Sequence, residues 1–162
     1  MQRLRQLIIV AICLVCASCD GPMNNSVPVY PVHLEINTKT VFIDFTPQNL
    51  NAYITVDRDG YKENGVRKLP VTAMDAWGYG GVVVYVSMVG YVAFDLACPH
   101  CAAEGRRSPC EMHGINAVCP HCGEEYEVAS GYAFPTKGIS KEAMRRLNTY
   151  VTYNGDIIQV RQ

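Results

Sequence analysis

The sequence of 162 residues has little excess charge of either sign, with 14 lysine and arginine residues against 15 aspartate and glutamate residues. It contains no long repeat and no low-complexity tract, and only the short segment 141–147 has a helical pattern. The charge balance gives no indication of nucleic-acid binding, and the scarcity of helical segments argues against an α/β domain. Cysteine is what the chain does have: eight in all, five of them between positions 98 and 122.

The longest apolar run, 7–17, lies near the start of the chain and follows Arg3 and Arg5. It is too short to span a bilayer comfortably, and a basic start, an apolar run and small residues are typical of an export signal. Cys16-Ala17-Ser18-Cys19 resembles the lipobox of bacterial lipoproteins, in which the signal is removed and the new N-terminal cysteine carries lipid. A simple cleaved secretory signal is the alternative.

This resemblance implies three regions: a signal peptide at 1–18, a lipidated tether at 19–26 and one domain at 27–162. Cys19 is then the lipidation site, and the protein is held at the extracytoplasmic side of the cell envelope, on the periplasmic or outer-membrane face. The expected partners are the membrane, through the lipid, and an unidentified envelope protein. We expect no nucleic-acid partner, and no small-molecule substrate is evident.

The first part of the domain has the patterns of β-strands. Residues 32–37 alternate apolar and polar side chains, 41–45 form a second short apolar stretch, and 51–56 are a third candidate strand that ends at an Asp-Arg-Asp-Gly turn. The segment 61–77 shows no steady period and contains glycine and proline, so we predict a long surface loop there.

The later part of the domain predicts two hairpins. Residues 82–86 are mostly valine, which indicates a strand buried on both faces, and the chain returns through 91–95 after a turn near Gly90. Asn154-Gly155 suits a type I′ turn, which predicts a hairpin over 149–160. Because 141–147 is the only helical segment predicted, the fold class is all-β.

Two identical tetrapeptides, Cys98-Pro99-His100-Cys101 and Cys119-Pro120-His121-Cys122, have seventeen residues between them. Two C-x2-C pairs at this spacing are typical of a four-cysteine zinc site. Proline inside each loop fixes φ, and the remaining amides can point at the thiolates. We therefore predict one metal centre held by Cys98, Cys101, Cys119 and Cys122. Four thiolates around zinc would leave no open position for catalysis, which predicts a non-enzymatic metal-binding module.

The chain from Gly80 onward resembles a Rieske-type domain, because the segments around the two tetrapeptides are similar to its two cluster loops. With the lipoprotein-like signal, the whole chain resembles Rieske-like lipoproteins of the Bacteroidetes type. The resemblance implies a Rieske-like antiparallel β sandwich with a small two-loop metal-binding subdomain at about 95–130. It also implies a [2Fe–2S] cluster as an alternative to zinc, which would make the protein an electron carrier. By position, Cys98, Cys119 and His100 match cluster ligands, while the fourth position is Cys122 instead of histidine.

A thiol–disulfide oxidoreductase is a less favoured alternative, since the same tetrapeptide occurs in periplasmic thiol oxidases, where the first cysteine caps a helix. Here Gly105 and Pro109 limit any helix after Cys101 to about one turn. The export signal lacks the paired arginines of the route that carries folded cluster proteins, which favours zinc over [2Fe–2S]. Cys110 is expected to be a half-buried thiol, and His121 an exposed loop residue.

Overall fold

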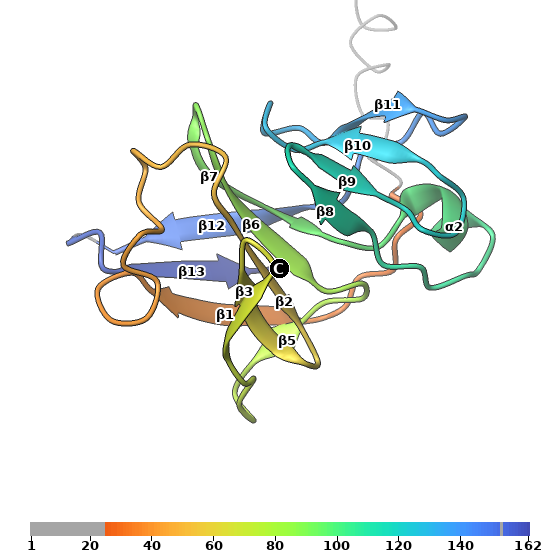
Figure 1. The fold of residues 1–162 in the computed structure, drawn as a ribbon. Helices are drawn as coiled ribbons and strands as arrows, with labels where there is room; N and C mark the ends of the chain where they lie inside the picture. Colours follow the sequence, from red (N-terminus) through yellow and green to blue (C-terminus); the bar gives the residue numbers. More distant parts are fainter. Residues whose placement is uncertain (1–24, 153) are drawn as a thin grey trace, which may run out of the picture.

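The computed structural model describes residues 25–152 and 154–162, which form an antiparallel β structure (Figure 1). The predicted signal peptide, the predicted lipidation site Cys19 and the predicted tether up to residue 24 lie outside the described residues. In the part that is described, no helix has the length and apolar character needed to cross a membrane. The all-β fold class is confirmed.

Within these ranges, two sheets and one short helix form. The first sheet has the strand order β4-β3-β2-β6-β7-β12-β13-β1-β5, with bounds β1 (Val32–Asn37), β2 (Tyr53–Asp57), β3 (Gly60–Glu63), β4 (Val66–Leu69), β5 (Ala76–Trp77), β6 (Val82–Ser87), β7 (Gly90–Asp95), β12 (Arg146–Val151) and β13 (Ile157–Arg161). The second has the order β11-β10-β9-β8, with bounds β8 (Glu111–His113), β9 (Asn116–Val118), β10 (Glu125–Glu127) and β11 (Phe134–Lys137). The helix is α2 (Pro99–Ala103).

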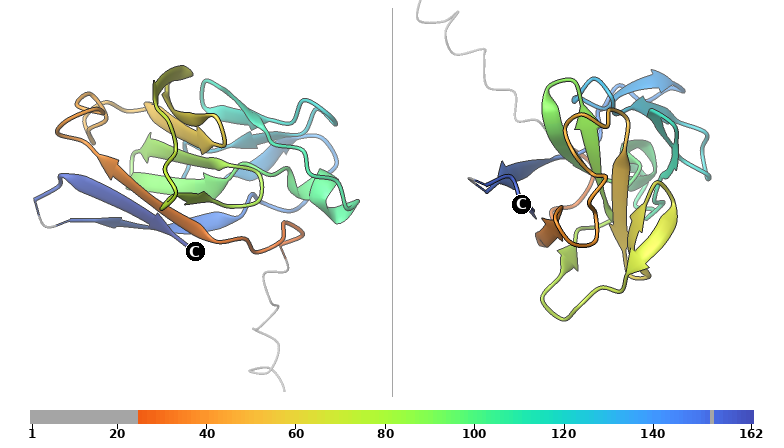
Figure 2. Two further views of the ribbon diagram at one scale, coloured as in Figure 1. Left: turned by 90° about the horizontal axis from the view of Figure 1, so that it is seen from below. Right: turned by 60° about the vertical axis from the view of Figure 1, so that its left-hand side comes forward.

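Strand β6 separates two apolar cores. Val82, Val84 and Val86 face a core shared with β1, β2 and β13, whereas Val83 and Tyr85 face a second core that contains the five cysteines. Alternate side chains of a strand point to opposite faces, so β6 is buried on both sides, as predicted. Figures 1 and 2 show β6 and β7 between the β1–β13 region and the small sheet. The second core therefore joins the small sheet to the rest of the domain.

The strongest strand predictions are confirmed. The predicted strand at 32–37 is β1, and the hairpin from 82 to 95 is the β6–β7 pair, in register from Val82 opposite Asp95 to Ser87 opposite Gly90. At the end of the chain, β12 pairs with β13, and Gly155 in the connecting turn has a φ of +71°. That conformation suits glycine. The Gly155 N–H is bonded to the Thr152 carbonyl at 2.8 Å, so Gly155 is the last residue of this turn, and the predicted type I′ turn centred on Asn154-Gly155 is wrong.

Three further predictions of local structure are wrong. Segment 61–77 is not a loop, because it contains most of β3 and all of β4 and β5. Segment 141–147 is not helical; Met144 is buried and donates its backbone N–H to Ala133, and β12 starts at Arg146. Segment 41–45 forms turns in place of a strand, with the Phe45 N–H bonded to the Phe42 carbonyl at 3.0 Å. In each segment, tertiary contacts override the local pattern.

The small sheet and α2 carry both CPHC loops. The first loop follows β7 and forms α2, whereas the second connects β9 to β10. The metal-binding subdomain was predicted at about 95–130, but the small sheet continues past residue 130, because β11 pairs with β10. The two loops meet where the second core reaches the end of the small sheet.

Candidate metal centre

The approach to the first loop is fixed by the buried carboxylate of Asp95, at the end of β7. It accepts hydrogen bonds from the backbone N–H groups of Tyr79, Gly80 and Ala97 at 2.7–2.8 Å. A Cβ at Gly80 would overlap the backbone nitrogen of Ala97, so only glycine allows this close approach. Burial raises the pKa of Asp95, while the three N–H bonds and Arg145 oppose that shift. The buried carboxylate thus positions the chain just before Cys98.

The first CPHC loop begins the short helix α2. Cys98 occupies the N-cap position, and its backbone N–H bonds to the carbonyl of Ser108 at 3.0 Å. The N–H of Arg106 returns to the carbonyl of Cys101 at 2.8 Å, and Gly105, with a φ of +73°, follows the helix. A helix of one turn agrees with the limit predicted from Gly105 and Pro109. The segment after α2 is therefore bonded back onto the loop.

The second CPHC loop is a tight turn between β9 and β10. The N–H of Cys119 bonds to the Glu124 carbonyl at 2.8 Å, and the N–H of Gly123 bonds to the Cys119 carbonyl at 2.9 Å. Gly123 has a φ of +76°, the left-handed conformation that glycine adopts without strain. The buried Glu124 carboxylate accepts the N–H groups of Ile139 and Ser140 at 2.6 and 3.1 Å. A distant segment thus holds the turn in place.

The sulfur atoms of Cys98, Cys101, Cys119 and Cys122 all lie within 4.8 Å of one another. The Sγ atoms of Cys98 and Cys122 are 3.6 Å apart, and those of Cys101 and Cys119 are 3.7 Å apart. All four thiols are free, so none of these contacts is a disulfide. Only Cys122 is partly accessible to solvent. The four cysteines predicted from the sequence therefore come together in one buried group that could hold one metal ion.

Two hydroxyl groups contact the sulfur atoms. The Tyr126 hydroxyl lies 3.5 Å from Sγ of Cys98, and the Ser108 hydroxyl lies 3.3 Å from Sγ of Cys119. Both side chains are buried. Hydrogen bonds to thiolates offset the negative charge of a four-sulfur site and orient its ligands. Sequence analysis missed Ser108, because nothing in its local sequence distinguishes it from an ordinary loop serine.

The thiols of Cys98, Cys101 and Cys122 differ in acidity when no metal neutralises them. Hydrogen bonding from Cys110, with help from the Cys101 backbone N–H and Tyr126, lowers the pKa of Cys98 to about 4 even though burial opposes it. Burial raises the pKa of Cys122 to about 11, and burial together with neighbouring thiols raises the pKa of Cys101. Once one thiolate is present, repulsion disfavours a second charge nearby. A cation at the centre would remove that repulsion.

The remaining candidate residues surround the four sulfurs. His100 lies on α2 outside the four-sulfur group, and its buried Nδ1 has no hydrogen-bond partner within the described residues. His121 is exposed, as expected, and contacts the Arg106 guanidinium. Cys110 is more buried than predicted: its side chain packs in the same core as the four cysteines, because the Cys110 N–H is bonded to the Leu96 carbonyl at 2.7 Å.

Comparison with known proteins does not identify a family. No protein-family model matches the chain, and no curated protein matches its sequence. The Rieske-like resemblance therefore stays a prediction, and a functional conclusion must come from the geometry of the four cysteines.

Proposed function

We propose that this protein is an exported, lipid-anchored envelope protein whose four-cysteine site holds one structural zinc ion, and that it is not an enzyme. The fold supplies the ligands from two loops that are far apart in the sequence, one on α2 and one between β9 and β10. An ion bound by all four would join these loops inside the second core. Binding energy of such a site becomes folding energy, because the unfolded chain has no preformed site.

The sulfur–sulfur separations carry this proposal. Four ligands at the Zn–S distance of about 2.3 Å in a tetrahedron are about 3.8 Å from one another. The two contacting pairs, at 3.6 and 3.7 Å, are close to this value. In a [2Fe–2S] cluster the protein ligands divide between two irons, which places ligands on different irons farther apart than ligands on one ion. A group confined within 4.8 Å suits a single ion better.

One observation favours the [2Fe–2S] electron carrier as the second candidate. The buried Nδ1 of His100 lacks a partner within the described ranges, and this is the residue that matches a cluster histidine in the Rieske-like pattern. A rearranged loop could bring this nitrogen to an iron in exchange for a thiolate. The thiol–disulfide enzyme gains no comparable support, because Cys98 is buried and a reactive thiolate needs access to its partner disulfide.

Metal content and colour distinguish these functions. The chain is expressed with its own N-terminal segment, purified from membranes without oxygen, and measured for metals by mass spectrometry and for visible absorption. Zinc near one equivalent per chain without colour supports the structural site. Two irons with matching sulfide and a broad visible band would contradict the zinc site and support the [2Fe–2S] electron carrier. One iron without sulfide would support a single-ion site that holds iron in place of zinc.

Cysteine variants test the ligand set. Cys119→Ser removes a proposed ligand, so we expect less than half of the wild-type metal content after dialysis. Val128→Ala is the control, because it truncates a buried side chain of the same core outside the four-sulfur group. Equal metal loss in both variants would contradict the proposed ligand set. Release into the soluble fraction on Cys19→Ala would test the lipid anchor separately.

A further inference from the structure

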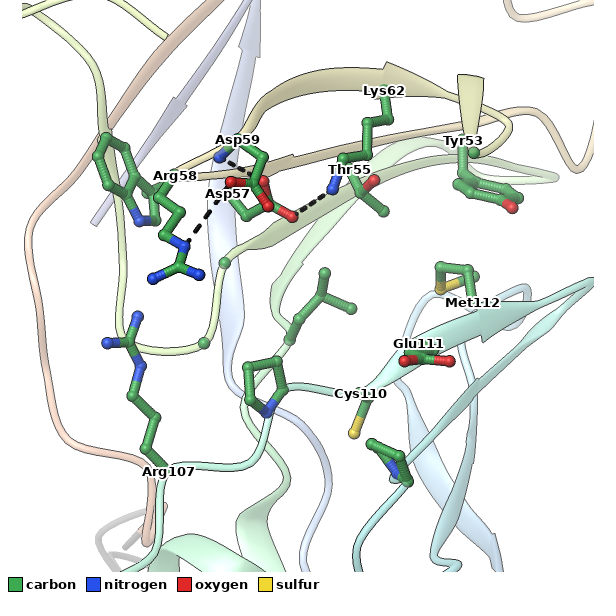
Figure 3. A pocket seen from close by; sticks show the side chains of 17 residues that line it. Tyr53, Thr55, Asp57, Arg58, Asp59, Lys62, Arg107, Cys110, Glu111 and Met112 are labelled. Atoms are coloured by element: carbon green, nitrogen blue, oxygen red, sulfur yellow. Dashed lines mark hydrogen bonds and ion pairs between the residues drawn. The ribbon is translucent and has the colours of Figure 1, made fainter. Parts of the chain in front are cut away.

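An open groove of about 670 Å³ runs along the domain beside the metal centre (Figure 3). One wall is the β2–β3 hairpin, and the other is the segment 107–112 that follows α2. Gly80, Gly81 and Leu96 line it between these walls, where the glycines add no side-chain volume. This volume is within the usual range for small-molecule sites. No feature of the sequence points to the groove, because its walls come together only in the folded chain.

Two guanidinium groups face one another across this groove. Figure 3 shows Arg58 on the hairpin and Arg107 on the opposite wall, with their side chains pointing toward each other. Arg107 forms no ion pair within residues 25–152 and 154–162; its guanidinium instead lies 5.6 Å from the centre of the Tyr79 ring. Such a cation–π contact holds the side chain without neutralising it. Two facing guanidinium groups repel each other, and a bound anion would remove that repulsion.

The acidic residues of the groove do not already satisfy both arginines. The Asp57 carboxylate is bonded to Lys62 at 2.7 Å and to the backbone N–H of Asp59 at 2.8 Å. The Asp59 carboxylate lies 3.7 Å from Nε of Arg58, which is longer than a hydrogen bond. Figure 3 shows Glu111 at the other end of the groove, beside Met112. The arginine end therefore has unused hydrogen-bond donors.

The rest of the groove is less polar. Figure 3 shows Tyr53 and Met112 on opposite walls, away from the arginine pair, and Leu96 and Pro109 add apolar surface to the lining. Arginine forks match the planar or tetrahedral oxygens of carboxylates and phosphates, while aromatic and thioether groups pack against apolar ligand bodies. The two ends of the groove thus differ in what they can contact.

We propose that this groove binds a small organic anion, with a carboxylate or phosphate between Arg58 and Arg107 and an apolar body toward Tyr53 and Met112. The inference does not depend on which metal the four cysteines hold. It does depend on the position of Arg107, which the backbone bonds of Arg106 to Cys101 and of Cys98 to Ser108 fix on either side. A ligand in the groove would lie next to Cys110 and so close to the metal centre.

The test uses phenyl phosphate and benzoate as anionic probes, with benzyl alcohol as the uncharged control. Trp77 lines the groove and is the only tryptophan in the chain, so its fluorescence reports binding directly. The purified metal-loaded protein is titrated, and Arg58→Gln and Arg107→Gln are compared with Arg67→Gln. Arg67 lies exposed on β4 outside the groove and is the matched control.

We expect saturable binding of at least one anion, weakened about tenfold or more by each groove variant and unchanged by Arg67→Gln. The tighter of the two probes identifies the preferred head group. Three results would each overturn the inference: no saturable change with either anion up to about 10 mM, equal binding of benzyl alcohol, or equal weakening by Arg67→Gln. Because all three arginines are exposed, the variants are expected to fold, and matching circular dichroism spectra check this.

Discussion

Zinc affinity should rise steeply with pH, because the metal must displace protons from thiols that the fold keeps neutral. Burial raises the pKa of Cys122 to about 11 and also raises the pKa of Cys101. Both thiols are therefore protonated near neutral pH in the metal-free protein and must lose their protons on binding. Cys98 differs, since its pKa of about 4 makes it a thiolate already.

The size of the effect follows from the number of protons released. Each proton lost on binding changes the apparent affinity tenfold per pH unit, which is about 1.4 kcal/mol. Release from Cys101 and Cys122 thus gives at least about a hundredfold per pH unit, or about 2.7 kcal/mol. The affinity for zinc therefore increases as pH rises. It does not level off below about pH 8, because the pKa values of Cys101 and Cys122 both lie above that range.

The assay is competition for zinc against a chromophoric chelator, with the chelator's own pH dependence measured separately. Cys122→Ser is the matched variant: it should bind more weakly and lose about one factor of ten per pH unit from the slope, because one fewer proton is released. A wild-type slope of tenfold per pH unit or less would refute the argument that two neutral thiols must ionise. An unchanged slope in Cys122→Ser would refute the role assigned to that thiol.

Three further predictions concern the support of the site. Tyr126→Phe removes the hydroxyl 3.5 Å from Sγ of Cys98 and should weaken metal binding about tenfold or more while keeping one metal per chain; unchanged affinity in the same competition assay would count against the contact. Gly80→Ala places a methyl group against the Ala97 backbone and should lower the free energy of unfolding by about 1–3 kcal/mol in urea. A loss no larger than that of Ala103→Gly, at the exposed last residue of α2, would contradict this prediction. Asp95→Asn puts an amide donor where a carboxylate oxygen now accepts at least one of three backbone N–H groups. It should lower the free energy of unfolding in urea by about 1–3 kcal/mol. The control Asp44→Asn, at an exposed turn, should change that free energy little.

The sequence alone determined the features that depend on local pattern. Alternation identified β1, the valine run identified a strand buried on both faces, and Asn154-Gly155 located the last turn. The two CPHC loops identified all four residues of the sulfur group, because C-x2-C spacing lets both cysteines of a tight turn point at one centre. Each of these signals is complete within a few consecutive residues.

The tertiary structure decided what depends on segments distant in the sequence. Strand β4 was missed because all four of its residues are exposed, so no alternation marks it, and only pairing with β3 makes it a strand. Segment 141–147 has a helical composition, yet the buried Met144 and the pairing of β12 with β7 keep it extended or irregular. Ser108 reaches Cys119 because the chain returns after α2, and Arg58 faces Arg107 because a hairpin folds over that same return. Contacts between distant segments leave no local pattern, so only the folded chain could reveal the supporting groups and the groove.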